Sequence, residues 1–280
     1  MRFEASLATR LLLETDTMSV PVDLKTLAEK NNIIVQEDDS SGYAGMLLVV
    51  NDLAMISVKK SIRENSRKRF TIAHEIGHYV LPGHISKENT MFQCTDEHLN
   101  SFGKNKTKEV EANVFASELL MPDQLFSPRV SGKDISKKLV KELTDEFQTS
   151  LSATCIKLIN CKDDYSLVCS VDSRVKWFCR GAQFPYYLNA NPGTPVHQDS
   201  FVYHFFETTK THDNFYEVPT ESWIDDEKVN NSTTLKEMVI GIPSYSMALS
   251  FLYIEKTEGE DFTDDGAEYQ ELDGYPKFSD

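Results

Sequence analysis

The segment Phe70–His78 constrains the fold and chemistry of this chain more than any other part of the sequence. It reads Phe-Thr-Ile-Ala-His-Glu-Ile-Gly-His, an apolar stretch that predicts a helix carrying His74 and His78. Residues i and i+4 are neighbours on one helix face, so these two imidazoles can bind the same zinc ion. Glu75 projects to an adjacent sector, where a general base could reach a water on that ion.

The pattern His-Glu-x-x-His also arises by chance, and an ordinary core helix is the alternative interpretation. The surrounding residues favour the metal site. Phe70, Ile72 and Ile76 are among the apolar neighbours. Two histidines and a glutamate buried among such side chains would be costly without a metal or hydrogen-bond partners.

A catalytic zinc ion needs three protein ligands and one open position for water, so a third ligand must lie elsewhere. His84 is one candidate, because His74, His78 and His84 have the spacing found in metzincin proteases. Leu81, however, stands where metzincins have a glycine that breaks the helix. His84 would therefore need a different turn to reach the metal.

Glu111 is the preferred candidate for the third ligand. On a predicted helix it projects between Val114 and Phe115, and a carboxylate in this apolar sector needs a positive partner. Glu109 is expected to face the other way, beside Ala116. A solvated helix charge is the alternative role for either glutamate.

Apolar periodicity and turn residues predict an α+β protein with a mixed N-terminal half and a β-rich C-terminal half. Predicted helices cover residues 3–14, 23–31, 64–81 and 108–121, with two or three short helices up to residue 159. Predicted strands cover 33–35, 43–50, 54–58, 165–171, 175–179, 201–206, 215–218, 238–242 and 248–254, with a turn at Asn51-Asp52. The polar segment 86–107 is expected to be an irregular loop near the site.

Four regions follow from this pattern. We expect a metallopeptidase-like domain over 1–125, a helical segment over 126–162, a β-rich domain over 163–256 and an acidic tail over 257–280. Within the second region, residues 139–159 have the rhythm of a helix-turn-helix motif or, equally well, of a plain helical hairpin. The tail is expected to be solvated and mobile.

The net charge and the cysteine content restrict the classes of partner that we expect this protein to bind and the compartment in which we expect it. The formal net charge of −15 and the pI near 4.9 argue against direct nucleic-acid binding, because phosphates would be repelled. No apolar run reaches the length of a membrane span, and the N-terminus lacks the pattern of a signal peptide. Five cysteines without a C-x-x-C pair indicate reduced thiols, so we expect a cytoplasmic protein with a protein or peptide partner.

Two strings together resemble the ImmA/IrrE family of metallopeptidases. They are Arg69-Phe-Thr-Ile-Ala-His-Glu-Ile-Gly-His and Glu111-Ala-Asn-x-Phe-Ala-Ser-Glu-Leu-Leu-Met-Pro. Pro21-Val-Asp-Leu before a helix and the Tyr43-Ala-Gly-Met hairpin are also similar to this family, so the resemblance covers roughly residues 10–160. The family's usual histidine soon after the second ligand is displaced here, to His84.

The resemblance implies a small zincin-like domain in which His74, His78 and Glu111 bind Zn²⁺ and Glu75 is catalytic. The donor chemistry of such a site also admits Mn²⁺. The resemblance also implies a substrate class, the helix-turn-helix transcriptional repressors that control phage, mobile-element or stress programmes. Some members carry a GAF-like sensory domain at the C-terminus, which the region from about 163 could match. His84, His98 and Tyr79 are candidate accessory donors to the oxyanion.

A catalytically silent role is the alternative hypothesis. In it the zincin-like shell is a binding or antitoxin-type regulatory module, and the C-terminal sheet recognises a signal. The complete His74-Glu75-x-x-His78 motif favours the enzyme, and measuring bound zinc separates the two hypotheses.

Overall fold

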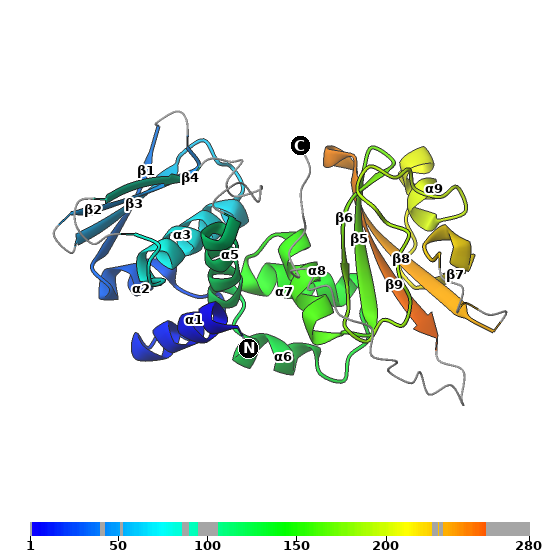
Figure 1. Ribbon diagram of the computed structural model, residues 1–280, viewed down its shortest axis with the longest axis horizontal. Helices are drawn as coiled ribbons and strands as arrows, with labels where there is room; N and C mark the ends of the chain where they lie inside the picture. The colour runs from blue at the N-terminus through cyan, green and yellow to red at the C-terminus, as the bar shows by residue number, and fades with distance from the viewer. Residues whose placement is uncertain are drawn as a thin grey trace. The chain divides into compact units, whose positions relative to one another are not determined.

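The computed structural model describes residues 2–39, 43–50, 53–85, 90–94, 106–225, 229 and 232–255. The chain divides into two compact units (Figure 1). Unit 1 comprises Met1–Lys133 and Lys141–Thr154, and unit 2 comprises Asp134–Val140 and Cys155–Asp280. The predicted turn at residues 51–52 and the predicted acidic tail at 257–280 lie outside the described residues.

A four-stranded sheet with the order β1-β3-β2-β4 forms one layer of unit 1. Its strands are β1 (Ile33–Asp38), β2 (Gly45–Val50), β3 (Leu53–Lys59) and β4 (Thr90–Cys94). β1 is parallel to β3, whereas β2 is antiparallel to both β3 and β4. Leu47, Val49 and Ile56 are fully buried, because alternate residues of these strands face the helices.

The second layer of unit 1 is helical and contains α1 (Phe3–Glu14), α2 (Leu24–Lys30), α3 (Asn65–Val80) and α5 (Lys106–Leu120) (Figure 1). The Asp23 side chain begins α2 as its N-cap, accepting from the backbone N–H groups of Lys25 and Thr26. Helix α3, which carries the histidine motif, ends at Val80, and Leu81 is already extended before the proline.

Small residues let α3 and α5 approach closely. A Cβ added at Gly77 would lie 3.1 Å from Cδ1 of Phe115 and 3.4 Å from the backbone of Ala112. Even a methyl group at position 77 would fit tightly, and the Phe115 ring would have to move by a few tenths of an ångström to admit it. This helix contact places the polar residues at the start of α5 against the histidine face of α3.

Three further helices lead out of this layer. They are α6 (Asp123–Val130), α7 (Lys137–Phe147) and α8 (Leu151–Cys161). The rings of Phe126 and Phe147 pack with centroids 5.2 Å apart. Whether α7 and α8 act as a helix-turn-helix motif stays a prediction.

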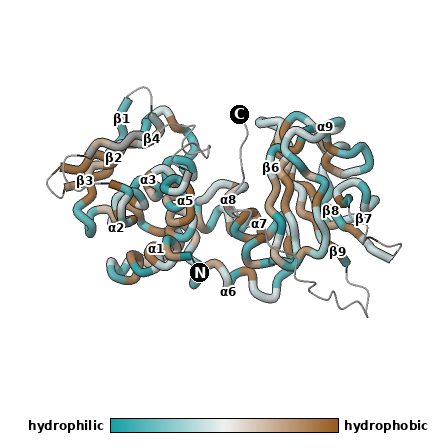
Figure 2. Tube along the Cα trace, viewed as in Figure 1, coloured by the Kyte–Doolittle hydropathy of each residue, from teal (hydrophilic) through white to brown (hydrophobic). Residues whose placement is uncertain are grey.

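Unit 2 contains an antiparallel five-stranded sheet with the order β6-β5-β9-β8-β7. The strands are β5 (Tyr165–Val171), β6 (Arg174–Arg180), β7 (Tyr216–Val218), β8 (Thr234–Ile242) and β9 (Met247–Glu255). Helix α9 (Phe201–Thr208) packs on β8 and β9, and short 3-10 turns span Thr220–Ser222 and Pro243–Tyr245. Figure 2 shows hydrophobic residues concentrated along the strands of this sheet.

These observations confirm the predicted α+β class with a β-rich C-terminal region. The GAF-like assignment of that region stays a prediction. Among the described residues, no helix is both long enough and apolar enough to span a membrane.

Two predicted elements were wrong. The segment 201–206 forms helix α9 instead of a strand, because Ser200 caps its N-terminus and Val202 and Phe205 bury one helical face. Gly241 of β8 makes room for this face, since a Cβ there would come within 2.1 Å of Phe205 Cε2. The aromatic composition of the segment had suggested a strand.

The second error concerns the segment 86–107. Within it, Thr90–Cys94 forms β4 on the edge of the sheet, paired with β2, and α5 already begins at Lys106. Short strands gain their stability from a neighbouring strand, which a polar local sequence does not reveal.

A buried carboxylate joins α9 to the sheet. Glu237 of β8 is 1% exposed, and the backbone N–H of Phe201 donates to its Oε2 at 2.7 Å. Burial raises the pKa of Glu237 from an ordinary 4.5 to about 7. The folded protein therefore retains this proton over a pH range in which the unfolded chain releases it.

Replacing Glu237 with glutamine should make unit 2 less sensitive to pH. Between about pH 4.5 and 7 the wild-type folded state binds more protons than the unfolded state, so its stability falls as the pH rises. Raising the pH from 5 to 8 should therefore destabilise the wild type by about 2–3 kcal/mol relative to Glu237→Gln. Urea titrations followed by tryptophan fluorescence report on this unit, because Trp177 and Trp223 both lie in it. If the two proteins differed in free energy of unfolding by the same amount at pH 5 and pH 8, the prediction would be contradicted.

Candidate metal centre

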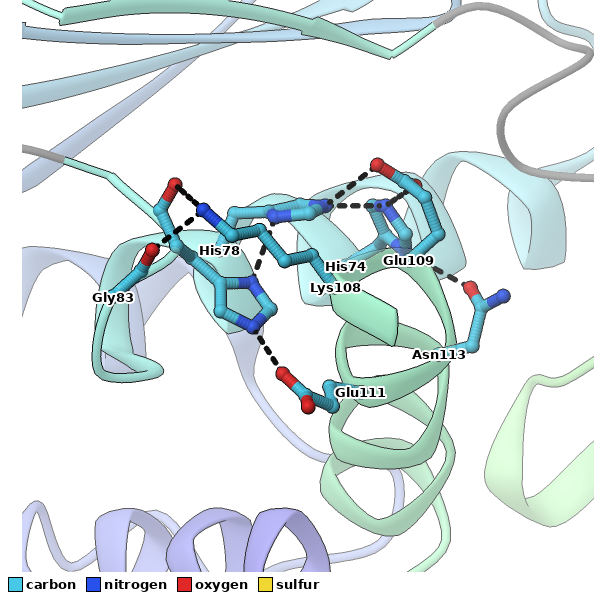
Figure 3. Close-up of polar contacts among 8 residues, drawn as sticks. His74, His78, Gly83, Lys108, Glu109, Glu111 and Asn113 are labelled. Atoms are coloured by element: carbon cyan, nitrogen blue, oxygen red, sulfur yellow. Dashed lines mark hydrogen bonds and ion pairs between the residues drawn. The ribbon is translucent and has the colours of Figure 1, made fainter. Parts of the chain in front are cut away.

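Helix α3 brings the two motif histidines together in the interior of unit 1. His74 and His78 are both fully buried, one helical turn apart. Their Nε2 atoms face each other at 3.0 Å (Figure 3). Two imidazole nitrogens this close together can supply two of the four ligands of one tetrahedral metal ion.

Glu109, near the start of α5, supplies a third donor. Its Oε2 lies 3.2 Å from Nε2 of His74, and its Oε1 lies 3.6 Å from Nε2 of His78. The three donor atoms lie within 4.8 Å of one another, and all three residues are buried. Atoms bound to one tetrahedral zinc ion at ~2.0–2.1 Å are themselves ~3.3 Å apart, so this donor set fits the ion.

The second ring nitrogen of each histidine has its own partner. Nδ1 of His74 lies 2.9 Å from Oδ1 of Asn113, an oxygen that can only accept. Nδ1 of His78 lies 3.0 Å from Nδ1 of His84. Partners on the Nδ1 side leave both Nε2 atoms available to a metal and fix the planes of the rings.

The charges of the cluster suit a divalent cation. Burial lowers the pKa of His78 to about 4, which leaves a neutral imidazole at neutral pH. Burial alone would raise the pKa of Glu109, but the contacts of its carboxylate with His74 and His78 outweigh burial and hold the pKa well below its usual range. Neutral histidine and ionised glutamate are the protonation states that ligate metals.

The predicted third ligand differs from the residue that the structure places beside the histidines. Glu111 points away from Nε2 of His74 and His78, and its Oε2 pairs with Nε2 of His84 at 2.8 Å. The Glu111 side chain is 32% exposed, against 7% for Glu109. Glu109 was expected to face the other way, and this expectation was wrong.

The error has a physical origin. Helix α5 is buried around most of its circumference, so apolar neighbours do not indicate which sector faces α3. The facing sector contains Glu109, Ala112 and Asn113, with the i, i+3, i+4 spacing of one helix face. Ala112, matched to Gly77 on α3, was the signal in the sequence that could have identified this sector.

The remaining predicted residues have different locations. Glu75 is fully buried on α3, and a Cβ added at Gly45 of β2 would lie 2.6 Å from its Oε1. Tyr79 packs against the hydrophobic core of unit 1. His84 contacts His78 and Glu111. His98 lies outside the described residues.

Comparisons with known proteins agree with this architecture. Residues 28–158 match the family Peptidase_M78, described as the IrrE N-terminal-like domain. No curated protein matches the chain. Among solved structures, a Mycobacterium tuberculosis transcriptional regulator is similar over 91% of this chain and 88% of its own, with a TM-score of 0.55 and 12% identity.

The structural neighbour shows a shared fold. The family match covers the segment that contributes His74, His78 and Glu109, and it confirms the resemblance drawn from the motif strings. Residues 28–158 of this chain belong to the IrrE N-terminal-like family of metallopeptidase domains.

Proposed function

We infer that the chain is a zinc-dependent endopeptidase that hydrolyses a peptide bond in a protein substrate. One observation carries the proposal: three buried donors, His74, His78 and Glu109, converge within 4.8 Å in a domain of a metallopeptidase family. Glu75 follows the first ligand directly in sequence, where the general base of such a site is expected.

His74, His78 and Glu109 would hold the cation, leaving a fourth position open. A divalent ion there would acidify a water molecule and stabilise negative charge on the scissile carbonyl oxygen. Glu75 accepts a proton from the attacking water on its carboxylate and then delivers it to the leaving amine nitrogen. Asn113 holds the ring of His74 in the orientation that this arrangement needs.

Zinc is favoured over manganese by the donor set. Two imidazole nitrogens and one carboxylate form a common catalytic zinc set, whereas manganese prefers sites richer in oxygen ligands. Elemental analysis of the purified protein should find one zinc ion per chain. A stable protein that binds neither metal would instead support the catalytically silent binding module.

For the substrate, we favour a helix-turn-helix transcriptional repressor. The resemblance of residues 28–158 to the IrrE N-terminal-like family supports this class. The decisive experiment incubates the zinc-loaded chain with a repressor encoded beside its gene and maps new termini by mass spectrometry. Cleavage of a general peptide library without cleavage of the repressor would retain the peptidase and reject the substrate class.

Gly45 is predicted to matter for catalysis through Glu75. In Gly45→Ala, the new Cβ would lie 2.5 Å from Cγ2 of Thr71 and 2.6 Å from Oε1 of Glu75. Thr71 is fully buried and short, so the Glu75 carboxylate must move. A displacement of this kind should lower kcat by ~10²-fold, with little change in zinc affinity.

The matched control is Val50→Ala at the exposed end of the same strand, which should retain full activity. Wild-type kcat in Gly45→Ala would show that the Glu75 carboxylate does not need its present position.

A further inference from the structure

We propose that His84 and Glu111 form a positioning dyad that fixes the tautomer and orientation of the metal ligand His78. The inference rests on the proposed metal centre. It assigns a role to two residues that the sequence offers as alternative direct ligands. The dyad acts through His78 and does not contact the metal itself.

Two short contacts connect Glu111 to the ligand His78 through His84 (Figure 3). Oε2 of Glu111 lies 2.8 Å from Nε2 of His84. Nδ1 of His84 lies 3.0 Å from Nδ1 of His78. On the far side of the His78 ring, Nε2 faces Nε2 of His74 and Oε1 of Glu109.

One arrangement of hydrogens satisfies these contacts and keeps the metal-facing nitrogen of His78 free. In it the Glu111 carboxylate accepts from Nε2–H of His84. A neutral His84 then has a lone pair on Nδ1, which accepts from Nδ1–H of His78. His78 is thereby fixed as the tautomer with a free lone pair on Nε2, the atom that faces the other two donors.

The chain segment after α3 is folded to hold this dyad. Gly83 has φ of +77°, a left-handed conformation that turns the backbone after Pro82 and returns His84 towards the helix. Nζ of Lys108 donates to the carbonyl oxygens of Gly83 at 2.6 Å and of His84 at 3.2 Å. The His84 side chain is consequently only 1% exposed.

This geometry also explains why the metzincin-like spacing does not produce a third histidine ligand. His84 approaches His78 from its Nδ1 side, opposite the Nε2 atom that faces Glu109. Both nitrogens of His84 already have partners. The spacing of His84 from His74 and His78 therefore indicates that it lies near the site. The turn at Pro82–Gly83 determines that it contacts His78 and does not face the metal.

The test measures zinc affinity in competition with a chelator, using the metal alone as probe. Outer partners of ligating histidines typically contribute 10–100-fold to metal affinity. Glu111→Ala should therefore bind zinc 10–100-fold more weakly. Glu111→Gln should stay within about threefold of the wild type, because its amide oxygen still accepts from Nε2–H of His84.

Two variants at position 84 complete the series. His84→Leu should lose affinity at least as Glu111→Ala does, because it removes the acceptor of His78, whereas Glu111→Ala removes only the group that orients that acceptor. His84→Asn should recover part of the loss, since its Oδ1 can stand where Nδ1 accepts. Glu29→Ala on the exposed surface of α2 is the matched control and should bind zinc as the wild type does.

The outcomes separate the two proposals. If the wild type binds zinc and Glu111→Ala binds it equally well, the dyad is overturned while the metal centre stands. If the wild type binds no zinc, the proposed function fails first. A lower melting temperature of the metal-free Glu111→Ala protein with unchanged affinity would indicate a purely structural role and would also overturn the dyad.

Discussion

Glu75→Gln should lose peptide cleavage and keep its metal. Glutamine preserves the volume of the buried side chain but cannot accept the proton of the attacking water. General-base catalysis of this kind is worth ~10²–10⁴-fold, so kcat should fall by that factor. Zinc content and affinity should remain those of the wild type, because Glu75 is not among the three converging donors.

Cleavage of the mapped substrate and zinc stoichiometry should be measured on the same preparation. The control is Glu29→Gln, the same chemical change at an exposed position of α2, which should leave both quantities unchanged. A Glu75→Gln protein with wild-type kcat would reject Glu75 as the base, and loss of zinc would assign it to metal binding instead.

Glu109→Ala should have the largest effect on metal binding. It removes one of the three converging donors, whereas Glu111→Ala removes a group that acts through His84 and His78. A direct ligand should contribute more than the 10–100-fold typical of outer partners, so Glu109→Ala should bind zinc more than ~100-fold more weakly. Cleavage should disappear with the metal.

The ratio between these two variants decides the ligand assignment. Chelator competition on both proteins gives it directly. If Glu111→Ala loses more affinity than Glu109→Ala, the third ligand is the one first predicted from the sequence, and the side chains at the start of α5 rearrange when metal binds. Circular dichroism of the metal-free proteins verifies that α5 remains folded in each.

Local sequence signals were sufficient where a segment's structure depends on its own residues. The motif helix was expected over 64–81 and spans Asn65–Val80, because its apolar spacing and the following proline are local features. The Asp23 cap and the start of α2 were recognised in the same way. The strands β8 and β9 also follow from their own apolar composition.

The remaining errors all depend on partners distant in sequence. β4 is a strand because β2 offers it a pairing edge, and α9 is a helix because β8 accepts Val202 and Phe205. The orientation of α5 depends on which of its buried sectors meets Gly77. Helical periodicity gives the angle between Glu109 and Glu111 around α5. It does not tell which side of α5 packs against α3, because that depends on the tertiary structure.

The close contact of Gly77 with Ala112 and Phe115 links two properties of the molecule that are usually considered separately. The cation would have ligands on both α3 and α5, so occupying the site and keeping these helices packed are one thermodynamic event. The folded form would therefore gain free energy with the logarithm of the free zinc concentration. Supply of the metal in the cell would then control how long the protein survives as well as how fast it works.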